Sequence, residues 1–144
     1  MSVAKNNNEL ILKHLRRDAR KSFSSISRET GIPVTTVFDN YQKLEKSGII
    51  KKHASLLDFR KLGYYYRSFV FVRANEIDKL LSFLNDSSNV NSIFRTGDND
   101  YLVDVVFPSI KEFYYFIDSI REFNLEKLEA HDVIEHLKKE EFFC

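Results

Sequence analysis

The chain has 144 residues, enough for one ordinary domain or two small ones, and 43% of them are hydrophobic, which is enough to form a buried core. The longest strongly apolar runs are only a few residues long, so the sequence predicts neither a transmembrane segment nor a membrane partner. The N-terminal residues lack the apolar stretch of a secretory signal, and the single cysteine, Cys144, has no partner in the chain. These features predict a cytoplasmic protein.

The charges are unevenly distributed along the chain. The net charge is only +1, but residues 1–52 carry eleven Lys or Arg against five Asp or Glu, a balance of +6. Residues 53–144 carry eleven against sixteen, a balance of −5. Such asymmetry indicates a nucleic-acid-binding part joined to a part with another task, although chance clustering of surface charge remains an alternative.

The first half of the sequence predicts three helices. Apolar residues at helical spacing predict a first helix over about 7–17, and Ser22 occupies a capping position before a second helix over about 23–30. Gly31 is expected to end that helix, since glycine tolerates the left-handed conformation of a sharp stop. Pro33 suits the start of a third helix, which Gly48 ends.

The second and third helices together predict a helix-turn-helix, whose second helix can enter the major groove of DNA. In the third helix Val37, Tyr41 and Leu44 share one face, which is expected to be buried. The same geometry also occurs in proteins that bind no DNA. Local positive charge and the polar front of the third helix favour double-stranded DNA as the partner.

The side chains on the open side of this unit are the candidate DNA contacts. Threonine and asparagine can hydrogen-bond base edges, and cations can neutralise phosphates. Phe38 has a second interpretation, as a core residue or a contact to the other domain. The predicted DNA-binding residues are Ser22, Ser24, Val34, Thr35, Thr36, Phe38, Asp39, Asn40, Lys43, Lys51 and Lys52, and Arg16, Arg17, Arg20, Lys21 and Arg28 are further candidates for phosphate contacts.

The stretch at 18–63, DARKSFSSISRETGIPVTTVFDNYQKLEKSGIIKKHASLLDFRKLG, resembles the signature of the leucine-responsive regulator and AsnC family of transcription regulators. Two departures from the family pattern are Pro33, which replaces a serine cap, and Asn40, which replaces an arginine that commonly contacts DNA. The matching positions are Asp18, Ala19, Arg20, Ser22, Ile26, Gly31, Val37, Leu44, Glu45, Gly48, Ile49 and Ile50.

The second half predicts alternating strands and helices. Aromatic and β-branched residues at 64–73 predict a strand, and leucines at helical spacing predict a helix over 77–84. The segments 90–96 and 101–107 flank a polar turn and predict a hairpin, and a second amphipathic helix follows over about 113–123. For 125–138 composition favours helix whereas element order favours strand, and we predict strand.

The order βαββαβ is that of a ferredoxin-like sheet with two helices on one face. The fold class is therefore α+β, with a winged helix-turn-helix domain at 1–52, a linker strand at 53–63 and a ferredoxin-like assembly and ligand-sensing domain at 64–144. The other face of the sheet needs a cover, which a second copy of the module can provide. The family resemblance implies dimers, which often assemble to octamers.

The family resemblance also implies an amino-acid or other small-molecule effector near the turn formed by Thr96, Gly97, Asp98, Asn99 and Asp100. Backbone N–H groups of a glycine turn can hold a carboxylate, and an aspartate can take an ammonium group. The alternative is a hairpin turn made of turn-favouring residues without a ligand. Leu128 and Ala130 stand where related chains often carry pocket threonines, which argues against an ordinary amino-acid effector.

An enzyme is the rival interpretation, because a branch of proteins with this architecture decarboxylates sirohaem. Such chemistry would need histidines and arginines grouped in the second half, but no dense histidine motif is present. His131 and His136 lie five apart on the predicted strand and hence on opposite faces. The sequence therefore predicts no enzymatic activity, no metal site and no cofactor.

Overall fold

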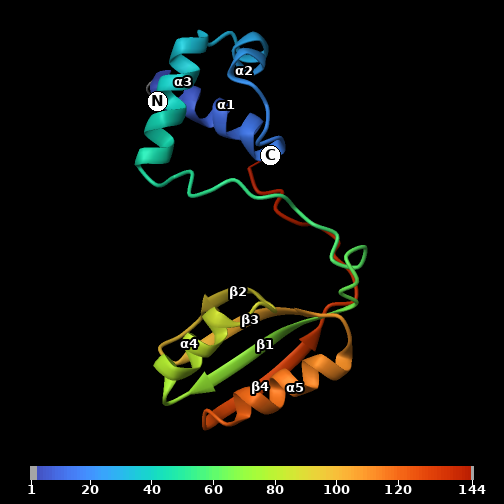
Figure 1. Cartoon of the computed structure of the whole chain (residues 1–144). Helices are drawn as coiled ribbons and strands as arrows, with labels where there is room; N and C mark the ends of the chain where they lie inside the picture. The colour runs from blue at the N-terminus through green and yellow to red at the C-terminus, as the bar shows by residue number, and fades with distance from the viewer. Residues whose placement is uncertain (1–2, 144) are drawn as a thin grey trace. The chain divides into compact units, whose positions relative to one another are not determined.

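The computed structural model describes residues 3–143, so Cys144 lies outside the described residues. The chain divides into two compact units (Figure 1). Unit 1 consists of two segments, the chain up to Leu56 and the chain from Leu137 onward. Unit 2 is Leu57–His136. Within 3–143, no helix is both long and apolar enough to cross a membrane.

Unit 1 contains three helices, α1 (Val3–Arg17), α2 (Phe23–Thr30) and α3 (Val34–Lys46). Helix α1 begins four residues before the expected start, because the apolar stripe that marks it in the sequence begins only at Leu10. The helices enclose a small core whose buried members are Ile11, Leu15, Ile26, Ile32, Val37 and Leu44.

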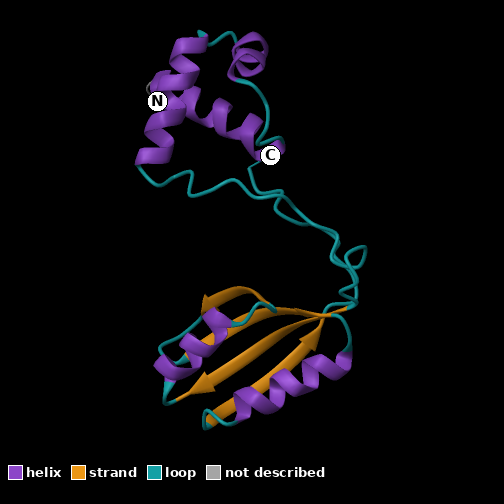
Figure 2. Ribbon diagram, viewed as in Figure 1, coloured by secondary structure: helices purple, strands orange, loops and turns teal. Residues whose placement is uncertain are grey.

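Unit 2 contains β1 (Tyr66–Ala74), α4 (Ile77–Asp86), β2 (Val90–Arg95), β3 (Asp100–Phe107), α5 (Ile110–Arg121) and β4 (Leu125–Asp132). The strands form one antiparallel sheet in the order β2-β3-β1-β4 (Figure 2). This is the predicted ferredoxin-like arrangement, and the α+β fold class is confirmed. The fold of each part was thus predictable from periodicity and element order.

The helices α4 and α5 cover one face of the sheet. Alternate residues of β1 and β3, among them Val70, Val72, Val103 and Val105, are buried in one core with Leu80 of α4 and Ile120 of α5. Because side chains alternate along a strand, the intervening residues of these strands face the opposite side. No helix of unit 2 packs on that opposite face among the described residues.

The last strand is shorter than predicted. We expected strand over 125–138, but β4 ends at Asp132, where Ser68 of β1 is its partner. The N–H of Val133 donates one further hydrogen bond to the Arg67 carbonyl at 2.8 Å. Strand β1 begins at Tyr66, which is level with Ile134 in this register, so the chain beyond Ile134 has no residue of β1 to pair with.

The expected linker strand at 53–63 does not form. Residues 53–58 have no regular structure and 59–63 make turns. This segment lies instead against the chain that follows β4: Arg60 Nη2 donates to the Ile134 carbonyl at 3.3 Å, and the Phe59 ring lies under the Arg67 guanidinium, 5.4 Å from ring centroid to Cζ. A β-strand needs a neighbouring strand that pairs with its backbone N–H and C=O groups. The sequence of the linker does not reveal that such a neighbour is missing here among the described residues.

Candidate nucleic-acid interface

The turn between α2 and α3 is fixed by Gly31 and its neighbours. Gly31 has a φ of 74°, and its N–H donates to the Ser27 carbonyl at 2.9 Å, which ends α2. The Thr30 hydroxyl donates to the Ile26 carbonyl at 2.6 Å and accepts from the N–H of Ile32 at 3.3 Å. Ile32 is buried, so the turn is anchored in the core on both sides.

Helix α3 packs with the predicted face inward. Val37 and Leu44 are buried, and Tyr41 is half-buried against the same core. Its phenol donates to Glu45 Oε1 at 2.6 Å, and this hydrogen bond raises the pKa of Tyr41. The face of α3 that packs is therefore settled, and the opposite side is left open.

The open side of α3 presents most of the predicted base-reading side chains. Thr35 and Asp39 are exposed, whereas Thr36 and Asn40 are half-buried. Val34 and Phe38 are each 45% exposed. Lys43 continues the same side and is exposed. The hydroxyls and the amide that are predicted to read bases are thus at least partly accessible from solvent.

The beginning of α3 carries no side-chain cap. Pro33 is its capping residue, and no side-chain hydrogen bond closes the first turn. The backbone N–H groups of a first turn have no partner within the helix and, with the helix dipole, attract anions. In α2, by contrast, the Ser22 hydroxyl accepts the N–H of Ser25 at 3.1 Å, so Ser22 acts in the fold as a cap, and the nearby Ser24 is exposed.

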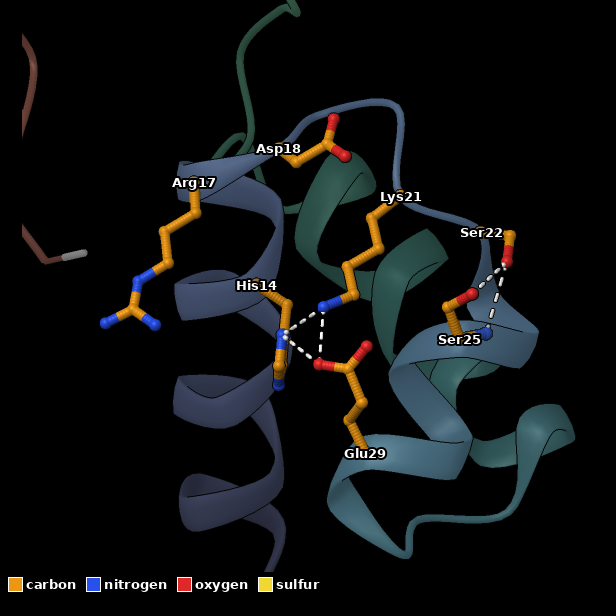
Figure 3. A pocket seen from close by; sticks show the side chains of 7 residues that line it. All are labelled: His14, Arg17, Asp18, Lys21, Ser22, Ser25 and Glu29. Atoms are coloured by element: carbon orange, nitrogen blue, oxygen red, sulfur yellow. Dashed lines mark hydrogen bonds and ion pairs between the residues drawn. The ribbon is translucent and has the colours of Figure 1, made fainter.

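A hollow of about 390 Å³ lies where α1, the turn after it and α2 meet (Figure 3). Lys21 Nζ lies 2.6 Å from Glu29 Oε2 and 3.0 Å from His14 Nδ1. The hydrogen bond from Lys21, the largest influence on Glu29, lowers the pKa of its carboxyl group. The lining residues are His14, Arg17, Asp18, Lys21, Ser22, Ser25 and Glu29.

This network changes the set of cations available to phosphate. The charge of Lys21 is balanced by Glu29, and Arg16 is paired with Glu140 at 2.6 Å, so both are weaker candidates than the sequence suggested. Lys51 and Lys52 are exposed in the segment after α3. When the residues from Leu137 onward are counted with it, unit 1 has a net charge of +6, whereas unit 2 has a net charge of −5.

An aromatic cluster beside the interface was missed by sequence reasoning. The Phe23 ring lies 5.9 Å from that of Phe38 and 4.9 Å from that of Tyr41, centroid to centroid. The ring of His53 stacks on Tyr41, and its Nε2 lies 3.0 Å from the phenol oxygen. Phe38 is therefore a partly exposed packing residue between α2 and α3. Spacing alone could not reveal the cluster because His53 belongs to the linker.

The predicted effector turn is held by two arginines of unit 2. Arg73 Nε and Nη2 donate to the two Asp100 oxygens at 2.5 and 2.8 Å, and this pairing lowers the pKa of Asp100. Arg95 donates to the carbonyls of Gly97 and Asp98 at 3.1 and 3.0 Å. The carboxylate of Asp100 is therefore already neutralised.

The remaining turn residues are open to solvent to different degrees. Thr96, Asp98 and Asn99 are exposed and Gly97 is half-buried. A Cβ on Gly97 would lie 2.9 Å from Asp100 Oδ2, so the glycine permits the close approach of this carboxylate. Its presence at this point of the turn is thus explained by packing.

The first comparison with known proteins concerns unit 1. A model of the family described as winged helix-turn-helix DNA-binding matches residues 6–51. The chain is 33% identical over 109 residues to a glutamate uptake regulatory protein of Zymomonas mobilis, a match that spans 72% of this chain but only 66% of that protein. It is 32% identical over 123 residues to an uncharacterised helix-turn-helix-type transcriptional regulator of Pyrococcus furiosus, which covers 82% of this chain and 77% of the relative.

Solved structures share the fold of both units. A transcriptional regulator of Neisseria meningitidis in complex with L-methionine has a TM-score of 0.83 and 20% identity, with 92% of this chain and 91% of that one covered. An AsnC family transcriptional regulator of Agrobacterium tumefaciens has a TM-score of 0.80 and 22% identity, with 96% and 94% covered. The similarity thus extends through both units.

Proposed function

The chain belongs to the leucine-responsive regulator and AsnC family of transcription regulators, and from that membership we propose that it selects particular sequences of double-stranded DNA with the open side of α3. The observation that carries this proposal is the accessible polar front of α3, with Thr35 exposed and Thr36 and Asn40 half-buried, on a unit of charge +6. Hydroxyls and amides can read base edges in the major groove.

The cations after α3 supply affinity rather than selectivity. Lys51 and Lys52 are exposed and adjacent to the reading helix, and Lys43 lies on its open side. Phosphate neutralisation by lysine is independent of sequence and weakens with salt. Val34 and Phe38 add apolar surface that can lie against a thymine methyl.

The open face of the sheet is the proposed dimer contact. Phe94, which is 51% exposed, lies opposite Leu102 in the sheet register, and Phe69 and Phe71 follow on β1. An antiparallel sheet with apolar residues on its uncovered face is stabilised by a partner there, and a second copy offers a matching surface. Two copies place two reading helices on two half-sites about one DNA turn, or a multiple of it, apart. Association of dimers to octamers is the further step that the family implies.

An effector at the turn 96–100, an amino acid or another small molecule, is also part of the proposal. The L-methionine complex of the Neisseria relative supports a ligand of this class. Because Arg73 holds Asp100, we assign Asp100 to orienting the turn, and Asp98 with the backbone of Gly97 and Asn99 to contacting the ligand. The side chain of Thr96 is exposed beside them.

The regulator acts, in this proposal, in the cytoplasm and without enzymatic activity. The relatives are named as regulators. The histidines that the rival sirohaem chemistry would use have other partners: His53 stacks on Tyr41 in unit 1, and His136 contacts Arg67 in unit 2. His131 is exposed on β4, 4.0 Å from Glu129.

Selection of bound duplexes from random DNA tests the proposal. The full chain should enrich a roughly palindromic motif at physiological salt, and a pool of amino acids should change the affinity for that motif or the spacing of its halves. Enrichment without any motif would reject sequence selection. An unchanged profile with every amino acid would reject the effector while leaving DNA binding intact.

A further inference from the structure

The end of the chain returns to the helix-turn-helix unit. The chain leaves unit 1 between Leu56 and Leu57, and it re-enters unit 1 between His136 and Leu137. Residues 137–143 are called the tail below, and Figure 1 shows the red end of the chain beside the blue helix α1. Unit 1 is thus connected to unit 2 through two segments of chain, the linker and the tail.

The tail meets α1 through Arg16 and Lys13. Arg16 Nη2 lies 2.6 Å from Glu140 Oε2, and Arg16 Nε donates to the Phe142 carbonyl at 3.1 Å. The Lys13 ammonium lies 5.8 Å from the centroid of the Phe143 ring. Lys13 and Arg16 are three apart on α1 and therefore share one side of the helix. The tail carries no net charge, but its Glu140 carboxylate and Phe143 ring thus lie against two cations of α1.

The contact fixes the tail backbone as well as one side chain. Arg16 binds a carboxylate and a main-chain carbonyl two residues apart, so both donors must be satisfied by one conformation of the tail. Glu140 and Phe143 have φ values of 54° and 69°, in the left-handed region that non-glycine residues rarely adopt. An ordered contact can compensate for that unfavourable backbone conformation.

The contact is nevertheless weak enough to open. The side chains of Arg16 and Glu140 remain 39% and 54% exposed, and exposed ion pairs add little stability. A free peptide of this composition would therefore bind poorly. The tail is attached to the same chain through β4, and attachment gives it a high effective concentration at α1.

We propose that the tail is a reversible strap, in which Arg16 and Glu140 are the positioning residues, and that it restricts the orientations of the reading unit and thereby sets the spacing of half-sites that the dimer accepts. This inference rests on the proposed dimer on DNA. A unit held through two segments samples fewer orientations than a unit held through one. Restricting those orientations before binding lowers the ordering cost on a duplex whose spacing fits.

A charge-reversal series tests the strap. The readout is the affinity for a duplex with the preferred spacing divided by the affinity for a duplex lengthened by about half a helical turn, roughly five base pairs. Glu140→Arg and Arg16→Glu should each lower this ratio by a factor of roughly two to five, the range expected for an exposed pair. The double variant Arg16→Glu with Glu140→Arg should restore it.

Glu141→Arg is the matched control, because it makes the same charge change one residue away, where the ion-pair partner is Lys138 at 4.0 Å. It should leave the ratio unchanged. Affinity for a duplex with a single half-site reports the proposed function separately from the strap. A Glu140→Arg ratio equal to that of the unmodified chain, or a double variant that restores nothing, would overturn the strap.

Backbone relaxation by NMR gives a readout that does not involve DNA. Tail amides of the unmodified chain should show order parameters near those of α1, and Glu140→Arg should lower them below about 0.6, the range of flexible segments. If the tail of the unmodified chain already relaxes as a free segment, the strap is wrong even if the chain binds DNA as proposed. If the tail is rigid but the chain fails to bind DNA, the contact between the tail and α1 stands, but its proposed role in half-site spacing is rejected.

Discussion

Among the described residues, each of the two units has one face on which no further helix packs, and the chemistry of the two faces differs. In unit 1 the open side of α3 carries hydroxyls, an amide and cations on a unit of charge +6. In unit 2 the open side of the sheet carries aromatic and aliphatic residues such as Phe94 and Leu102, on a unit of charge −5. A polar, positive face is the kind that binds a polyanion, whereas an apolar face between ion pairs is the kind that the proposed second copy of the chain would cover.

The units also differ in how they are stabilised. The described core of unit 1 is formed by six buried side chains from three short helices and the turn between two of them, and that of unit 2 by thirteen, from strands and helices. Unit 2 adds a buried ion pair on its open face, whereas the ion pairs of unit 1 are partly exposed. Unit 1, with the smaller core, is therefore expected to unfold first.

Removing the buried carboxylate of unit 2 should have the largest effect. Asp104 is 3% exposed and accepts from Arg67 Nε at 2.7 Å and from Asn91 Nδ2 at 2.6 Å. Asp104→Ala leaves the Arg67 charge poorly compensated, and the free energy of unfolding should fall by about 3 to 5 kcal/mol in chemical denaturation. Asp118→Ala, at an exposed pair on α5, should change it by less than about 0.5 kcal/mol. Equal effects would show that Asp104 is not paired as described.

A cavity in the core of unit 1 should be nearly as costly but should affect different functions. Ile26 is fully buried, and Ile26→Ala should destabilise unit 1 by about 2 to 5 kcal/mol. DNA binding should weaken at temperatures where the proposed dimer persists, measured by thermal unfolding beside light scattering. Leu80→Ala, a buried change in α4, is the counterpart that should lower the stability of unit 2. Loss of the dimer in Ile26→Ala would mean that the units do not unfold separately.

The turn of the helix-turn-helix offers a smaller and purely backbone effect. Gly31 has a φ of 74°, and nothing lies within 4 Å of the Cβ that an alanine would add. Gly31→Ala should therefore cost about 1 to 2 kcal/mol through the left-handed conformation alone. Gly31→Asn is the control, since asparagine tolerates this region better and should recover part of the loss. Equal stability of both variants in denaturant melts would exclude this explanation.

The smallest expected effect is a pH dependence confined to unit 1. Hydrogen bonding from Lys21 holds the pKa of Glu29 below its ordinary value of 4.5. A carboxyl with a lowered folded pKa adds stability above its unfolded pKa, and this stability is lost as the pH falls through the folded pKa. The difference in unfolding midpoint between the unmodified chain and Glu29→Gln should therefore shrink as the pH falls below 4.5. A difference that stays constant into acid would contradict the pairing.

Local sequence signals predicted the fold well because they act within a few residues. The cap at Ser22, the stop at Gly31 and the face of Val37 and Leu44 all depend on neighbours along one helix. Even the early start of α5 had such a signal, since Ser109 caps the helix and hydrogen-bonds Glu112, a spacing that defines a capping box. These features required no knowledge of distant partners.

Contacts between distant residues were not predictable in the same way. The end of β4 depends on where β1 begins, and the missing linker strand depends on the absence of a ladder partner among the described residues. The pairing of Arg16 with Glu140 joins residues 124 apart in the sequence. No periodicity or spacing rule reports such pairs, so the predicted phosphate contacts needed the structure to separate paired cations from open ones.

The central claim is that the open side of α3 selects the sequence, and a specificity ratio tests it most directly. The affinity for the selected duplex is divided by that for a scrambled duplex of equal length, over a series of salt concentrations. Thr35→Ala with Thr36→Ala should lower the ratio by roughly 5-fold to 150-fold, the value of one good base contact. Lys51→Ala with Lys52→Ala should weaken both affinities equally and reduce the log–log salt slope by about 0.9 for each phosphate that is no longer neutralised. An unchanged ratio in the threonine variant would contradict the claim.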